Sequence, residues 1–183
     1  MKKAVFVLAI ALLVSGSSFA QLVTNGGFET GNFAGWSQFG NTGFTGVDGG
    51  ANSGSFGAYF GAVGSQGGIQ QTIGTCAGCT YTLDFWMAND GGDPNSVTIS
   101  FDGLTLVNAS NVGGFGYTQF TFAGLQVGDN ANLAFAFQQN PAYYHLDDIS
   151  VTLTETPEPG SLALLGSGML GLGGAIRRKL IAR

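Results

Sequence analysis

The segment from Gln21 to Thr156, called the body below, contains neither lysine nor arginine. All six basic residues lie nearer the termini, whereas ten of the eleven carboxylates lie in the body. With His145 neutral, ten acids and no Lys or Arg give the body a charge of −10, against −5 for the whole chain. A surface without cations cannot neutralise phosphate groups, so nucleic-acid binding and electrostatic docking to anionic lipid are excluded.

Catalytic groups are also scarce. The body has one histidine, His145, and two glutamates, Glu29 and Glu155, and it lacks G-x-S-x-G and H-E-x-x-H motifs. Glycoside hydrolysis needs only two carboxylates and stays open as an alternative, although the E-x-D-x-x-E strand of jelly-roll glucanases is missing. The sequence therefore predicts a non-enzymatic protein, with His145 as a packed strand residue.

The N-terminus has the form of a secretory signal peptide. Lys2 and Lys3 precede the apolar stretch Ala4–Val14, and Ser18-Phe19-Ala20 supplies a small-x-Ala cleavage site. We therefore expect the Sec machinery to export the chain, with cleavage between Ala20 and Gln21.

The C-terminus carries a second targeting pattern. An uncharged apolar run, Gly160–Ile176, is about as short as a helix that crosses a bilayer can be. The flanking residues are Pro157, Glu158 and Pro159 before the run and Arg177, Arg178 and Lys179 after it. Since basic residues stay on the cytoplasmic side of a transmembrane helix, we expect the body to lie outside.

These three parts, in this order, resemble the PEP-CTERM sorting signal of Gram-negative bacteria that make extracellular polysaccharide. The resemblance implies cleavage by an exosortase near Pro157–Pro159, after transient anchoring in the inner membrane, and release or transfer to the cell surface or exterior. A permanent anchor remains an alternative. So does a helix that dimerises through small residues spaced four apart, Ser167, Gly171 and Ala175.

The only two cysteines, Cys76 and Cys79, form a C-x-x-C. A zinc site would need a second pair, and a thioredoxin-like motif would need a βαβ context. In an exported chain we expect a small disulfide that holds the turn before the strand at Thr80.

The body is long enough for one domain, residues 21–156, between the signal peptide at 1–20 and the sorting signal at 157–183. Its apolar residues alternate, and no stretch shows a sustained helical period. We expect strands near residues 56–63, 68–74, 80–86, 96–101, 104–107, 118–122, 132–137 and 145–153. The sequence thus predicts an all-β fold, a two-sheet β-sandwich of the jelly-roll type with eight or nine strands.

The two ends of the body, "LVTNGGFETGNFAGW" and "YYHLDDISVT", resemble the first and last strands of carbohydrate-binding jelly rolls. The resemblance implies that these ends are adjacent, that Trp36 is buried and that they share a structural calcium ion. The implied ligands are the carboxylates of Glu29 and Asp148, backbone carbonyls near Asn25, Gly26 and Gly27, and Asp147 in reserve.

Calcium suits such a site because it accepts many oxygen ligands in a flexible geometry. Strand alternation places Asp147 on the inward face with Ile149 and Val151, where an unpaired carboxylate would be costly. The alternative is that Glu29 and Asp148 are ordinary solvated or turn-capping carboxylates.

The faces opposite the expected core predict a sugar-binding strip, in which the ring of Trp86 stacks on a pyranose beside short polar side chains. Tyr143 and Tyr144 are expected to be exposed at its rim. The strip comprises Asp84, Trp86, Thr98, Ser100, Tyr117, Gln119, Asn132 and Gln138. The alternative is that Trp86 packs under a loop and the polar residues only face water.

These patterns together predict an exported, exosortase-processed surface or extracellular-matrix protein, associated with exopolysaccharide or biofilm. The second possibility is a lectin-like module with a defined glycan.

Overall fold

The computed structural model describes residues 21–154, which form ten β-strands. The strands are β1 (Ser37–Gly40), β2 (Thr45–Asp48), β3 (Gly57–Phe60), β4 (Gly67–Ile73), β5 (Thr80–Asn89), β6 (Asn95–Phe101), β7 (Leu104–Ser110), β8 (Phe115–Gln126), β9 (Ala131–Gln139) and β10 (Tyr144–Leu153).

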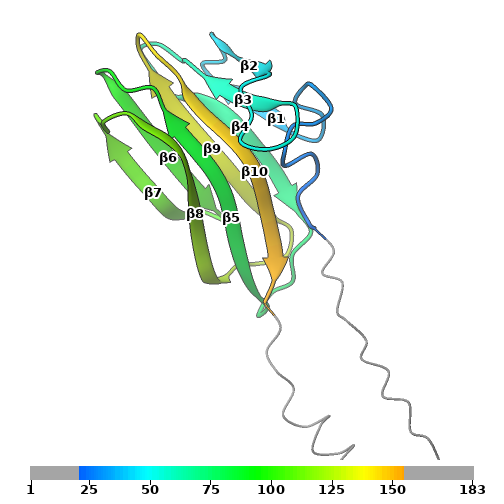
Figure 1. Ribbon diagram of the computed structural model, residues 1–183. Helices are drawn as coiled ribbons and strands as arrows, with labels where there is room; N and C mark the ends of the chain where they lie inside the picture. Colours follow the sequence, from blue (N-terminus) through cyan, green and yellow to red (C-terminus); the bar gives the residue numbers. More distant parts are fainter. Residues whose placement is uncertain (1–20, 155–183) are drawn as a thin grey trace, which may run out of the picture. The chain divides into compact units, whose positions relative to one another are not determined.

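The strands form two antiparallel sheets of five (Figure 1). Sheet A has the order β1-β4-β9-β6-β7, and sheet B has the order β2-β3-β10-β5-β8. The all-β, two-sheet prediction is confirmed, and each of the eight expected strands is present. The number of strands is ten, because β1 and β2 are four-residue edge strands that bury no side chain fully and so show no alternation.

The core lies between the sheets, where aromatic and branched side chains meet. The ring centroids of Phe60 and Phe137 are 4.6 Å apart, and those of Phe85 and Phe135 are 5.2 Å apart at an interplanar angle of 83°. Such tilted and edge-to-face pairs add to the free energy of burial. The period-two pattern of the sequence is therefore the pattern of side chains that face the opposite sheet.

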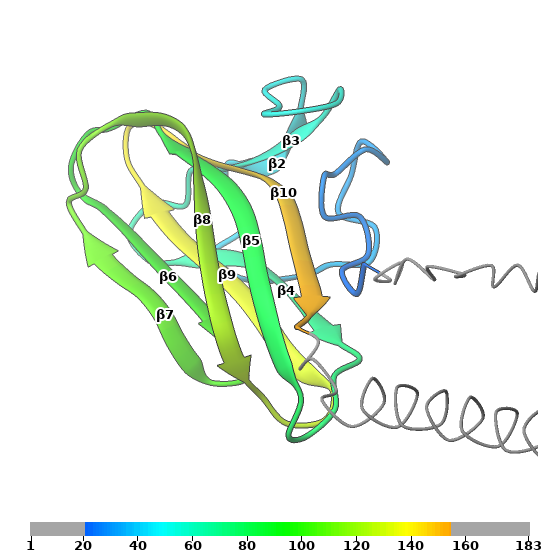
Figure 2. The ribbon, with the colours of Figure 1, turned by 60° about the horizontal axis from the view of Figure 1, so that its bottom comes forward.

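The N-terminal segment runs as a series of turns beside β10 (Figure 2). The N–H of Ile149 donates to the carbonyl of Gly26 at 3.0 Å, and a Cβ on Gly26 would lie 2.0 Å from the carbonyl oxygen of Ile149. Only glycine allows so close an approach. Trp36 is 7% exposed, and its Nε1 donates to the carbonyl of Asn25 at 3.2 Å. The predicted adjacency of the two ends is confirmed, although the first is a turn segment and not a strand.

The expected signal peptide and sorting signal lie outside the described residues. Within residues 21–154, no helix is long and apolar enough to cross a membrane. The ten strands and their core are complete within this segment, so we expect it to fold without the termini.

Candidate functional site

Sheet B carries a row of rings on the face that points away from the core, called the aromatic face below. Tyr59 of β3 is paired with His145 of β10, and Trp86 lies on β5. Tyr143, just before β10, lies 5.5 Å from Tyr59 and 6.5 Å from His145, measured between ring centroids. The ring of Tyr117 on β8 is 6.4 Å from that of His145. The ring contacts thus join Tyr59, Tyr143, His145 and Tyr117, and the strand register places Trp86 on the same face of the sheet.

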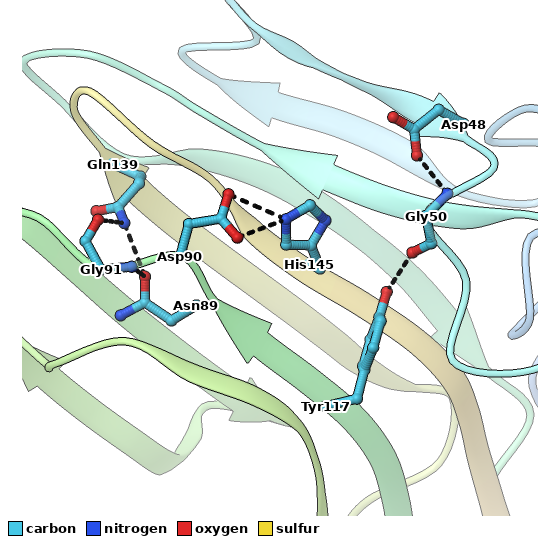
Figure 3. Close-up of polar contacts among 8 residues, drawn as sticks. All are labelled: Asp48, Gly50, Asn89, Asp90, Gly91, Tyr117, Gln139 and His145. Atoms are coloured by element: carbon cyan, nitrogen blue, oxygen red, sulfur yellow. Dashed lines mark hydrogen bonds and ion pairs between the residues drawn. The ribbon is translucent and has the colours of Figure 1, made fainter.

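Carboxylates and amides lie among these rings. Nε2 of His145 lies 3.3 Å from both oxygens of Asp90, and the hydroxyl of Tyr117 donates to the carbonyl of Gly50 at 2.7 Å (Figure 3). Thr121 donates to Asp84, and Gln119 is exposed opposite Trp86. The face therefore offers many hydrogen-bond acceptors.

The electrostatic potential of this face is negative. Burial raises the pKa of the Tyr117 phenol above its ordinary value, and nearby carboxylates raise it further. These carboxylates are, in order of effect, Asp147, Asp48, Asp148 and Asp90. The phenol therefore stays protonated and acts as a donor.

The predicted sugar-binding strip is divided between the two sheets. Asp84, Trp86, Tyr117 and Gln119 lie together on sheet B, and Trp86 is half-buried. Thr98, Ser100, Asn132 and Gln138 lie on strands of sheet A. The prediction of a single continuous strip is therefore wrong. Alternation predicts which face of a strand a side chain points to, but it does not predict which sheet that strand joins.

Tyr144 is not at the rim. It is completely buried, its ring lies 5.2 Å from that of Phe137, and its hydroxyl donates to Oδ1 of Asn95 at 2.7 Å. Burial raises the pKa of this phenol to about 12. Successive strand residues point to opposite faces, so only Tyr143 of this pair can contribute to the aromatic face.

Asp147 is also completely buried, but not in the core. The register of β10 against β5 shifts between Asp147 and Ser150, and Asp148 has a φ of 51°. This bulge places Asp147 opposite Trp86, on the outward face. The expectation that Asp147 shares the inward face of Ile149 is therefore wrong.

The loop at residues 49–56 covers Asp147. Its Oδ2 accepts the N–H groups of Asn52 at 2.8 Å and Ser53 at 3.1 Å, and its Oδ1 accepts that of Asp148 at 2.8 Å. Burial raises the pKa of Asp147, and these three hydrogen bonds oppose the rise. The carboxylate is thus the anchor that holds the loop against sheet B.

Asp148 and Glu29 hold the same loop. Asp148 accepts from the hydroxyl of Ser53 at 2.7 Å and from Nδ2 of Asn52 at 2.8 Å. Glu29 accepts the N–H groups of Ser55 at 2.9 Å and Phe56 at 3.1 Å. The sequence analysis expected a calcium ion to neutralise these carboxylates. The donors of the loop already compensate part of that negative charge. Within residues 21–154, no three His, Cys, Asp or Glu side chains are grouped to hold a metal ion.

Gly27, one of the expected calcium-site residues, lies beside these acids. A Cβ on Gly27 would lie 3.6 Å from Oδ1 of Asp148 and 3.7 Å from Oδ1 of Asp147. Asn25 lies in the same turn, and its Nδ2 donates to the carbonyl of Asn32 at 2.9 Å.

Cys76 and Cys79 form a disulfide in the turn before β5, with Cα atoms 5.5 Å apart. The N–H of Ala77, between them, donates to Asp129 at 2.8 Å.

Three contributors to the site were not anticipated from the sequence: Tyr59, His145 and the loop at residues 49–56. Tyr59 and His145 lie on strands that the sequence predicts. Their positions in the alternating pattern indicated that both side chains point outward, toward the aromatic face. The loop at residues 49–56 gave no signal, because its contacts to Asp147 and Asp148 span nearly one hundred residues of sequence.

The fold is that of carbohydrate-binding modules of the jelly-roll type. The chain is similar to TmCBM61, solved with β-1,4-galactotriose (TM-score 0.59, 18% identity, covering 74% of this chain and 99% of that one). It is also similar to the CBM22-1 xylan-binding domain of Paenibacillus barcinonensis Xyn10C (TM-score 0.53, 17% identity, 78% and 99%). A third similar structure is the K3 cleaved adhesin domain of Lys-gingipain from Porphyromonas gingivalis w83 (TM-score 0.55, 14% identity, 73% and 99%).

Residues 155–179 match the PEP-CTERM protein-sorting motif. This motif implies an exported protein that is anchored in a membrane before an exosortase processes it. The comparison with curated proteins finds no match to this chain.

Proposed function

We propose that this is a non-enzymatic surface or extracellular-matrix protein of a Gram-negative bacterium, whose β-sandwich binds polysaccharide in an exopolysaccharide or biofilm setting. The row of rings on the aromatic face is the observation that carries the proposal. The sorting motif at residues 155–179 supports an extracellular location, where such polymers are the available ligands.

The chemistry of the aromatic face suits sugars. The face of an aromatic ring carries partial negative charge, so it attracts the weakly positive C–H groups on one side of a pyranose. Asp84 and Gln119, beside Trp86, and Asp90, beside His145, would accept hydrogen bonds from sugar hydroxyls. With no Lys or Arg in the body, acidic sugars would be repelled.

A glycan array probed with residues 21–154 tests this function. We expect binding to neutral oligosaccharides, and we expect Trp86→Ala to weaken it at least tenfold while the protein stays folded. Ser100→Ala, on sheet A, is the matched control and should bind as the wild type does. If no glycan is bound, or if Ser100→Ala weakens binding as much as Trp86→Ala, the proposed function or its site is wrong.

We also propose that one calcium ion links the N-terminal turn to β10. Its ligands are Glu29 and Asp148, with backbone carbonyls near Asn25 and Gly27 and with Asp147 in reserve. The two aspartate oxygens that lie around Gly27 support this arrangement. Each carboxylate oxygen has more than one lone pair, so an oxygen that accepts a hydrogen bond can still coordinate calcium.

Thermal unfolding of residues 21–154 with calcium and with EGTA, at fixed ionic strength, tests this site. Because the ion would bind only the folded state, a hundredfold excess over Kd adds about 2.7 kcal/mol. The resulting rise in Tm should disappear in Glu29→Gln and in Asp148→Asn. Identical wild-type curves with calcium and with EGTA would rule the ion out.

A further inference from the structure

A pocket of about 220 Å³ adjoins the aromatic face and shares Tyr143 with it. Three segments form it: the residues just before β2, the residues after β3, and the end of β9 with its connection to β10. Its lining residues are Phe44, Gly61, Val63, Gln139, Asn140, Pro141, Ala142 and Tyr143. Because Tyr143 packs on Tyr59 at 5.5 Å, the pocket continues the row of rings.

Backbone hydrogen bonds connect these segments, so the pocket is formed before any ligand arrives. The N–H of Gly61 donates to the carbonyl of Phe44 at 2.9 Å, and that of Gln139 donates to the carbonyl of Ala62 at 2.9 Å. The carbonyl of Tyr143 accepts the N–H of Asp90 at 3.0 Å. A preformed site loses little conformational entropy on binding.

Phe44 is an outlier in two respects. Its φ is 55°, a left-handed conformation that is rare for a bulky side chain. Its side chain is also 67% exposed, the largest value among the large hydrophobic residues of residues 21–154. Neither property favours stability, and backbone strain of this kind is concentrated where ligands are held.

Gln139 supplies the second unusual feature. Its Nε2 donates to Oδ1 of Asn89 at 2.7 Å and to the carbonyl of Gly91 at 2.9 Å, which fixes the orientation of the amide (Figure 3). Its Oε1 is buried without a hydrogen-bond partner among the described residues. An unsatisfied buried acceptor is costly, so this part of the pocket lining, like Phe44, does not favour stability.

We propose that this pocket binds one neutral sugar ring of the polysaccharide that lies on the aromatic face. This inference rests on the proposed function. No lining residue is charged, so the occupant is neutral. The volume is below the roughly 300–1,000 Å³ of sites for drug-sized ligands, which limits the occupant to a single ring. Phe44 and Tyr143 supply walls for its C–H faces, and Asn140 supplies polar groups for its hydroxyls.

Two variants change the pocket without disturbing the core. A Cβ on Gly61 would lie 2.6 Å from Cε1 of Tyr143, so Gly61→Ala must displace that ring, which lines the pocket. Phe44→Asn removes an exposed wall and replaces it with a residue that tolerates positive φ. Leu104→Asn, at another large hydrophobic residue that is 51% exposed, on β7 of sheet A, is the matched control.

The three variants and the wild type are compared, as residues 21–154, on an array of neutral oligosaccharides that includes β-1,4-galactotriose and xylohexaose, with oligogalacturonates as acidic probes. We expect both pocket variants to weaken binding to every neutral glycan at least tenfold while they remain folded, as melting curves will show, and we expect Leu104→Asn to bind normally.

If the pocket variants bind as the wild type does while Trp86→Ala does not, the pocket is not a subsite and the proposed function stands. Binding only to the acidic probes contradicts a neutral occupant. Binding to no glycan overturns the proposed function and the pocket together.

Discussion

Asp147→Ala is expected to release the loop at residues 49–56 from sheet B. A hydrogen bond to a charged group contributes about 1.5–3 kcal/mol, and Asp147 accepts three, from Asn52, Ser53 and Asp148. Part of this is offset, because desolvation of a buried ion costs roughly several kcal/mol and disappears with the carboxylate. We therefore expect the free energy of unfolding to fall by about 2–4 kcal/mol at neutral pH.

Urea denaturation measures this loss, and amide hydrogen exchange shows whether residues 50–56 lose protection before the strands do. Asp129→Ala is the control. That carboxylate accepts the backbone N–H of Ala77, but it is exposed, and solvent screening weakens interactions of exposed charges, so its loss should cost about 1 kcal/mol or less. If Asp147→Ala is no more destabilising than Asp129→Ala and the loop keeps its protection, Asp147 does not anchor the loop.

Four further results are expected. Tyr144→Phe should lower the free energy of unfolding by about 1 kcal/mol, because the hydroxyl that donates to buried Asn95 is lost; unchanged urea curves would contradict this. The pKa of Asp147 is raised on folding, so above about pH 3.9 the native state binds more protons than the unfolded state does. The free energy of unfolding of the wild type, relative to that of Asp147→Asn, should therefore fall as the pH rises through the raised pKa. A difference that stays flat or rises with pH would contradict the burial of this carboxylate. Raising the salt concentration from about 0.01 M to 0.5 M should raise Tm, because the body has ten acids and no Lys or Arg, and a fall in Tm would show that their repulsion is unimportant. Replacing Pro157 and Pro159 with alanine should leave an unprocessed precursor in the inner membrane. If the variant and the wild type release equal amounts of mature protein, identified by its intact mass, this prediction is refuted.

Hydrophobic alternation predicted the architecture because every second side chain of β5, β6 and β9 is buried against the sheet opposite to its own. The same reasoning failed where one residue breaks the repeat. The bulge at Asp148 moves Asp147 to the other face, and a positive φ at an aspartate has no distinct signal in one sequence.

The candidate site was only partly predictable. Trp86, Tyr117 and Gln119 share a face, and their parity was read correctly. Thr98 joins the other sheet, because strand order depends on contacts between residues far apart in the chain. The pocket at Phe44 depends on three loops meeting at one end of the sandwich, which residue types alone do not indicate.

Chemical-shift mapping by NMR tests the central claim most directly. Residues 21–154 are labelled with ¹⁵N and titrated with the neutral oligosaccharide that binds most strongly on the array. The account predicts that the shifted amides lie on β5, β8 and β10 around Trp86, Tyr117 and His145, and at the pocket around Tyr143. Shifts confined to sheet A, around Thr98 and Asn132, or no saturable shifts at all, would contradict it.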